Sequence, residues 1–277
     1  MGKVTPDFKR MLLQLPHSAS DYGAVALAAD LAGLLGIDLI GTYVDDGDLL
    51  SLVDLPDARE FRAGSWQPLD SSQFAMALAS ASRDAERLFL DCAGKHHPSF
   101  RVLESTTAAA QDAGKDDIVV VIEPKSPIER ATRQFGALLE HASSSTSSIL
   151  WVPSHTRRIV GPVVTIAGGP DDPCISAAVA IAASVKERVI LVPAGTSTDS
   201  LAPALDRAKS AGVAAALADA PFQDDLVLPA HLNPGLLIAA RNRALDRRKR
   251  MQIPRLLVAP NVQPANSDAQ PSQPGDS

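Results

Sequence analysis

The chain contains 277 residues, of which 45% are hydrophobic and 21% charged, and this usage excludes wholesale disorder. Its formal net charge of −6 argues against nucleic acid as a partner. No apolar run approaches the roughly 18 residues that cross a bilayer, so we expect no transmembrane segment. The N-terminus has no cleavable signal pattern, and two cysteines, Cys92 and Cys174, suit a reducing compartment. These features predict a cytoplasmic protein.

The beginning of the chain predicts a strand, a helix and a second strand. Residues 11–15 form a short apolar run, residues 21–36 carry apolar side chains at helical spacing, and residues 37–44 are typical of a strand. Gly36 is placed to end the helix, because glycine readily adopts the left-handed conformation found after a last helical turn. Short connections between such elements imply parallel strands with a right-handed crossover.

A long insertion follows the second strand, at about residues 45–72. From Asp45 to Asp70 it holds seven acidic residues against Arg59 and Arg62, a net charge of −5. Loops of this length are usually either functional or disordered. The elements expected after the insertion are a long helix near 73–93, a strand at 118–122 preceded by Asp116 and Asp117, a helical stretch, and a closing strand at 149–153.

The same pattern then occurs a second time. Its expected elements are a strand at 163–167, a turn at 168–172, a helix at 173–186, and strands at 189–192, 226–228 and 256–260. From Asp117 to the closing strand of the first copy is 32 residues, and from Asp225 to that of the second is 31. Preserved order and spacing predict a duplicated unit. Because the strands are apolar without alternation, we expect helices on both sheet faces.

The repeat predicts two α/β domains, one at residues 1–158 and one at residues 159–262. The boundary falls near residues 154–161, where a polar stretch and a Gly-Pro pair separate the copies. Residues 263–277 contain no large apolar side chain, so we expect a disordered tail there.

This layout resembles the universal stress protein family in its tandem form, with two such domains in one chain. The resemblance is carried by the opening segments 11–44 and 163–192 and by the closing segments 116–153 and 224–260. It implies two tandem doubly wound sheets, each of five mostly parallel strands flanked by helices. It also implies that the two domains pack as a pseudo-dimer.

Nucleotide-binding members of that family place an aspartate at the end of the first strand. They add a glycine-rich stretch of the form G-x2-G-x9-G-[S/T] after the fourth strand, where bare backbone approaches the phosphates. Here the aspartate position holds Pro16 in the first copy and about Ala167 in the second. The stretches at 123–136 and 229–241 lack the glycine series. The sequence therefore predicts the fold without a working nucleotide loop, and no cofactor.

The alternative is that ATP or AMP binds through backbone groups at the carboxyl ends of the strands, where open α/β sheets usually bind ligands. The candidate residues for such a site are Pro16, His17, Ser18, Glu123, Lys125, Ser126, Gly168, Gly169, Asp171 and His231.

Three smaller features have simpler structural interpretations. The turn at 168–172 could cradle an anion, but Asp172 as helix N-cap with Pro173 in the first turn explains it better. Cys92 with the pair at 96–97 offers too few ligands for a metal site, so none is predicted. The serine run at 143–148 predicts a flexible loop, with phosphorylation as the alternative.

A strongly basic segment lies near the end of the second copy. Residues 241–250 have a net charge of +5, and we predict that they lie on the last helix, with the preceding apolar residues 236–240 packed inward and the cations in water. Such a block could bind an acidic protein, a phosphate backbone, a membrane surface or the acidic insertion of the same chain. The candidate interaction residues are Arg241, Arg243, Arg247, Arg248, Lys249 and Arg250.

The predicted function is that of a non-enzymatic regulatory module that acts in a stress response through protein contacts. Its partner is an unidentified protein, and assembly into a homo-oligomer is open. The alternative function is an adenine-nucleotide-binding switch or weak ATPase with the same fold.

Overall fold

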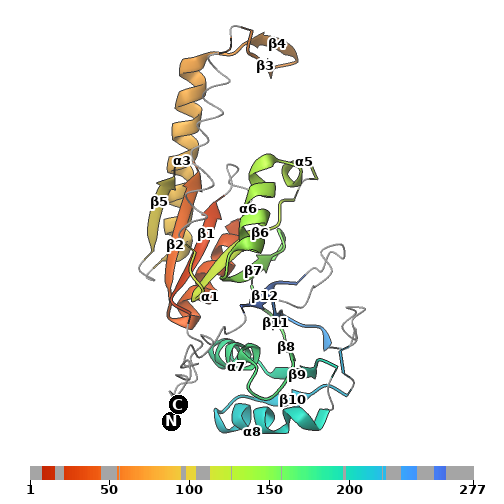
Figure 1. Ribbon diagram of the computed structural model, residues 1–277. Coiled ribbons are helices and arrows are strands. Elements are labelled where there is room, and N and C mark those ends of the chain that lie inside the picture. The colour runs from red at the N-terminus through yellow and green to blue at the C-terminus, as the bar shows by residue number, and fades with distance from the viewer. Residues whose placement is uncertain are drawn as a thin grey trace, which may run out of the picture.

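The computed structural model describes residues 8–15, 22–44, 55, 57–94, 98–103, 113–125, 127–156, 158–195, 198–219, 221–222, 232–241 and 253–259. Its centre is a ten-stranded sheet with the order β10-β9-β8-β11-β12-β7-β6-β1-β2-β5 (Figure 1). A separate two-stranded hairpin, β3-β4, lies away from it. The expected mostly parallel α/β architecture is confirmed.

The first half of the sheet consists of strands from residues 10–152, all parallel to one another. Its helices include α1 at Tyr22–Leu35, which ends at Gly36 with the expected positive φ of 68°. The five strands are β1 at Arg10–Leu15, β2 at Asp38–Val44, β5 at Ser99–Leu103, β6 at Asp117–Ile122 and β7 at Ser148–Val152. The remaining helices are α3 at Ser71–Ala93, α5 at Pro127–Arg130 and α6 at Arg133–Ser144.

The second half repeats this strand order, counted outward from the junction of the halves. Its strands are β8 at Val163–Ala167, β9 at Val189–Pro193, β10 at Ala215–Leu217, β11 at Leu236–Ala240 and β12 at Arg255–Val258. Its helices are α7 at Pro173–Val185, the 3-10 turn η2 at Thr198–Leu201 and α8 at Ala202–Ser210.

The two halves meet along their closing strands. The sequence predicts two separate five-stranded sheets, but β12 pairs with β7 in antiparallel fashion and joins both halves into one sheet. Helices α1 and α7 pack against each other across this junction, where the Ser184 hydroxyl donates to the carbonyl of Leu34 at 3.3 Å. One hydrophobic core cluster draws buried side chains from both halves. The two halves therefore share a hydrophobic core as well as a sheet.

The fourth strand of the second half differs from the sequence prediction. Residues 226–228, the expected strand, lie outside the described residues, and residues 236–240, expected on a helix, form β11 between β8 and β12. The physical reason is that Leu236–Ala240 is a short apolar run buried almost throughout. Periodicity alone cannot distinguish such a run from a piece of buried helix.

A long arm projects from the first half. It consists of the hairpin strands β3 at Arg59–Arg62 and β4 at Ser65–Pro68, followed by α3, whose N-terminus is capped by Asp70. Figure 1 shows α3 extending beyond the sheet with the hairpin at its far end. Only the C-terminal part of α3 is anchored, through Ala85, Phe89 and Ala93. The Phe89 ring packs on Gly41 of β2, where an added Cβ would approach it to 2.8 Å.

Candidate functional site

The turn between β8 and α7 is the second-half candidate for an anion loop. Two of its amides are occupied by a side chain from the turn itself: Gly168 N–H donates to Asp172 Oδ2 at 2.8 Å, and Cys174 N–H donates to Asp172 Oδ1 at 3.0 Å. Asp172 has extended backbone and Pro173 occupies the first turn of α7, so the predicted N-cap is confirmed. A bound phosphate would have to displace this carboxylate.

Asp171, in the same turn, is paired with a cation from α8. Its Oδ1 lies 2.9 Å from Arg207 Nη1, and the same guanidinium donates to the carbonyl of Pro170. Both side chains are largely exposed. Together Asp171 and Asp172 place two acidic side chains at a helix N-terminus, which disfavours the approach of a phosphate. Gly169, the remaining candidate in this turn, accepts through its carbonyl a hydrogen bond from Asp172 N–H.

The first-half candidates follow β6. Glu123 accepts a hydrogen bond from Arg130 Nη1 at 3.4 Å, while Lys125 is exposed. Glu123 also acts on Arg255 of β12: burial lowers the pKa of Arg255, and the carboxylate of Glu123 opposes this shift. Glu123 is therefore engaged by cations from both halves. The other candidates, Pro16, His17, Ser18, Ser126 and His231, lie outside the described residues.

Arg241 differs from its prediction as a solvated helix residue. It directly follows strand β11, is partly buried, and binds the C-terminal end of α6 in the other half. Its guanidinium donates to four backbone carbonyls. Those of Ala142, Ser143 and Ser147 each lie at 2.6 Å, and the fourth is that of Ser145. The last carbonyls of a helix have no partner within the helix and carry its negative dipole end, which a cation satisfies. Residues 242–250, with the other five interaction candidates, lie outside the described residues.

The serine run at 143–148 also differs from the expected flexible loop. Ser143 and Ser144 form the last turn of α6, and Ser148 opens β7. Ser147 and Ser148 are buried, and Ser148 Oγ accepts a hydrogen bond from Ala259 N–H of the second half at 3.0 Å. The physical reason is that Arg241 satisfies the carbonyls of this segment, so it is held in place across the junction.

His141, next to the Arg241 contact, predicts a pH effect on stability. Its Nε2 is buried and has no partner among the described residues, and burial followed by the charge of Arg241 lowers its pKa below the usual 6.5. The imidazole of His141 therefore binds a proton more tightly in the unfolded chain than in the folded protein. As a result, the free energy of unfolding falls as the pH drops below about 6.5, and it stops falling once the pH is below the lowered pKa of the folded state. We expect His141→Gln to reduce this loss, measured as the change in melting temperature between about pH 7.5 and 5.5. An unchanged pH dependence in the variant contradicts the prediction.

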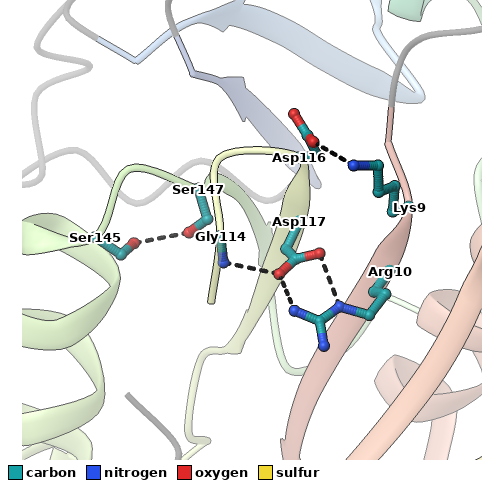
Figure 2. Close-up of polar contacts among 7 residues, drawn as sticks. All are labelled: Lys9, Arg10, Gly114, Asp116, Asp117, Ser145 and Ser147. Carbon is teal, nitrogen blue, oxygen red and sulfur yellow. Dashed lines mark hydrogen bonds and ion pairs between the residues drawn. The ribbon is translucent and has the colours of Figure 1, made fainter. Parts of the chain in front are cut away.

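A charged cluster that the sequence did not identify as a site lies at the amino ends of β1 and β6 (Figure 2). The Asp117 side chain, 3% exposed, accepts from Arg10 Nε at 3.0 Å, from Arg10 Nη2 at 2.6 Å and from Gly114 N–H at 2.8 Å. Beside it, Lys9 Nζ lies 2.8 Å from Asp116 Oδ2, and this hydrogen bond lowers the pKa of Asp116. The cluster borders an open hollow of about 720 Å³. Since each carboxylate holds a cation, the cluster ties β1 to β6 and offers no free acid or base.

Metal binding, thiol chemistry and membrane insertion find little support in the described part of the chain. No group of three or more His, Cys, Asp or Glu side chains there could hold a metal, and the histidines at 96–97 lie outside it. Cys92 is half-buried, and burial raises the pKa of its thiol. No helix in this part of the chain has the length and apolar character needed to cross a membrane.

Comparisons with known proteins show which fold this chain shares. No family model and no curated protein matches the sequence. Among solved structures, a universal stress protein from Archaeoglobus fulgidus DSM 4304 matches with a TM-score of 0.59 and 9% identity, over 90% of this chain and 95% of that one. A functionally unknown protein from Pseudomonas aeruginosa PAO1 matches with a TM-score of 0.50 and 14% identity, over 93% and 94%. The chain therefore has the fold of the universal stress proteins.

Proposed function

We propose that this chain is a non-enzymatic regulatory protein with the universal stress protein fold, which has no working nucleotide loop and acts in a stress response through protein contacts. In this proposal the two halves act as an internal dimer. Support for the internal dimer comes from the β7–β12 pair, the α1–α7 contact and the binding of Arg241 to α6.

The single observation that carries the proposal is the occupied turn after β8. Two amides there, those of Gly168 and Cys174, already bind the carboxylate of Asp172, and the neighbouring carboxylate of Asp171 pairs with Arg207. In a site of this kind the backbone amides must be free and the field positive. At this turn a nucleotide would have to displace the carboxylate of Asp172 from both of these amides.

The first half supports the same conclusion. Thr132 caps α6, the first long helix after β6, since its Oγ1 accepts from Phe135 N–H at 3.3 Å. Pro124 and Pro127 lie where the glycine series of nucleotide-binding relatives would bring bare backbone to the phosphates. The carboxylate of Glu123 already accepts from Arg130, and its charge opposes the lowering of the pKa of Arg255.

The test is a thermal-shift titration of the full chain with ATP and with AMP, together with the nucleotide content of the freshly purified protein. We expect no shift at millimolar ligand and no bound nucleotide, whereas a ligand at about 100 times its Kd would add about 2.7 kcal/mol of stability. A saturable shift, or stoichiometric adenylate in the preparation, would instead favour the nucleotide switch. The variants Asp172→Asn and Glu123→Gln then show which half holds the nucleotide, because the first removes a carboxylate from the candidate site of the second half and the other removes one from that of the first half.

A further inference from the structure

The arm ends in a hairpin that carries exposed aromatic side chains. Phe61 of β3 and Trp66 of β4 lie directly opposite each other, 64% and 65% exposed, with their rings 5.4 Å apart in an edge-to-face arrangement. Within the described residues, β3 and β4 pair only with each other. A two-stranded hairpin by itself is marginally stable in water, so a further strand along one of its edges would stabilise it.

The hairpin turn determines which main-chain groups of β3 face β4. Ala63 and Gly64 connect the two strands, and both have positive φ, of 51° and 86°. This conformation is typical of the two-residue type I′ turn, in which the flanking residues, here Arg62 and Ser65, form a hydrogen-bonded pair. Because hydrogen-bonded and non-hydrogen-bonded pairs alternate along antiparallel strands, the main-chain N–H and C=O of Phe61 point away from β4.

A hydrogen bond at the other end of the hairpin agrees with this assignment. Leu69 N–H donates to Ala58 O at 2.9 Å, which makes this pair a hydrogen-bonded one as well. Position 58 is separated from positions 60 and 62 by even steps, so all three face β4. The main-chain groups on the outer edge of β3 are therefore those of Arg59 and Phe61.

The two outer edges of the hairpin are not equivalent. On β4 the outward positions are Trp66 and Pro68, and a proline has no N–H to donate to a further strand. Prolines of this kind protect an edge from pairing. The sequence of β3 contains no proline. The outer edge of β3 is therefore the one that can accept a further strand.

The same strand of a second copy fits this edge in one antiparallel register. Outward residues have to pair with outward residues, and two registers then pair three residues of β3 with three of the other β3. One of them places Glu60 opposite Glu60, and like charges directly opposite each other are destabilising. The other places Phe61 opposite Phe61 and Glu60 opposite Arg62 of the second copy, a residue of opposite charge. Charge therefore selects the register centred on Phe61.

The selected register also aligns the aromatic side chains. Directly opposite residues share one face of a sheet, so the two Phe61 side chains become neighbours, and each keeps its own Trp66 on the far side. The result is a row of four rings across the strands β4-β3-β3-β4. Cross-strand aromatic pairs stabilise a sheet beyond the area that they bury. Pairing thus covers exposed aromatic surface and uses the open main-chain groups at the same time.

The position of the hairpin lets a second copy reach this edge. Residues 71–84 of α3 include no buried side chain, and they place about 21 Å of helix between the hairpin and the first buried residue, Ala85. Figure 1 shows the hairpin at the far end of α3, away from the ten-stranded sheet. Two copies can therefore join their hairpins while the rest of each protein stays apart.

We propose that two copies of this chain pair through their arms, with β3 of each copy antiparallel to β3 of the other about a two-fold axis at Phe61. Both copies present the same surface, as a two-fold interface requires. The contact is small, so the dimer is weak and reversible. This inference goes beyond the proposed function, which stands whether or not the arms pair.

Sedimentation equilibrium of the full chain, up to millimolar concentration, tests the pairing. We expect a reversible equilibrium between monomer and dimer. Phe61→Lys places two cations opposite each other at the axis and should weaken the dimer about tenfold or more. The matched control is Trp66→Lys, which removes the same ring pair within the hairpin but keeps the new cation away from the axis, and it should weaken the dimer less. Circular dichroism verifies that every variant is folded.

Charge variants on the other face of the hairpin test the register. Glu60→Arg and Arg62→Glu should each weaken the dimer about tenfold, because each places like charges opposite each other twice. The double variant with both changes should pair as the parent chain does. A mixture of the two single variants should form a heterodimer, since residue 60 of each copy then lies opposite a residue 62 of opposite charge.

Several results would overturn the inference. They are a chain that is monomeric at millimolar concentration, a dimer that Phe61→Lys leaves intact, equal weakening by Phe61→Lys and Trp66→Lys, and single charge variants that neither the double variant nor the mixture rescues. A monomer that sediments with phosphatidylcholine vesicles, and no longer does so as Trp66→Lys, would assign the aromatic face to a lipid surface instead. None of these results bears on nucleotide binding, which the thermal-shift titration decides separately.

Discussion

Replacing Asp117 with asparagine is expected to lower the free energy of unfolding by about 3 kcal/mol. Asp117 is almost fully buried and holds both Arg10 and the amide of Gly114. The substitution keeps the shape but removes the buried charge that compensates Arg10, whose side chain is 34% exposed, and a partly buried cation that loses its partner is costly. Urea unfolding followed by circular dichroism measures the loss.

The neighbouring Asp116 provides the matched control. It pairs with Lys9, whose side chain is 72% exposed, and exposed contacts of this kind contribute little to stability. Asp116→Asn should therefore leave stability nearly unchanged at neutral pH. Because its pKa is lowered in the folded state, its small contribution disappears only as the pH falls through that lowered value. Equal losses in the two variants would show that burial of the pair does not matter.

Much of the fold could be predicted from the sequence because local signals and burial agreed. The apolar runs at β1, β6 and β8 lie inside a sheet covered on both faces, so they carry no alternation. Gly36 and Asp172 mark a helix end and a helix start through backbone conformation and capping, which are local properties.

The remaining features depend on contacts between residues that are not adjacent in the sequence. The hairpin β3-β4 is closed by Ala63 and Gly64, both with positive φ, within a segment that the sequence predicts only as a long loop. Strand β11 could be assigned only from its position between β8 and β12. The antiparallel joint between β7 and β12 links residues more than 100 positions apart.

The candidate sites also divide into features set by adjacent residues and features set by contacts distant in the sequence. The absence of the glycine series and the capping role of Asp172 could be predicted because each depends on a few adjacent residues. The Arg10–Asp117 pair was not predicted, since it requires the register in which β1 faces β6. The aspartate pair at 116–117 is the available signal, but in the sequence it marks only the boundary of a strand.

The second large effect is expected at Arg241. Arg241→Met should lower the free energy of unfolding by about 3 kcal/mol, because it keeps the aliphatic stem but removes the guanidinium that donates to the carbonyls at the end of α6. Arg241→Lys should recover part of the loss, since an ammonium has three donors but lacks the planar fork. Urea unfolding measures both, and Arg207→Ala, which removes an exposed pair, should cost less than about 1 kcal/mol.

His141 gives Arg241→Met a second readout that general destabilisation does not produce. The charge of Arg241 helps to lower the pKa of His141, so its removal should raise that pKa toward 6.5, as followed by NMR titration of the imidazole. The loss of stability on acidification below about pH 6.5 should then become smaller than in the parent chain, because the folded and unfolded states titrate more alike. A variant with unchanged stability and an unchanged histidine titration would show that Arg241 does not hold the two halves together.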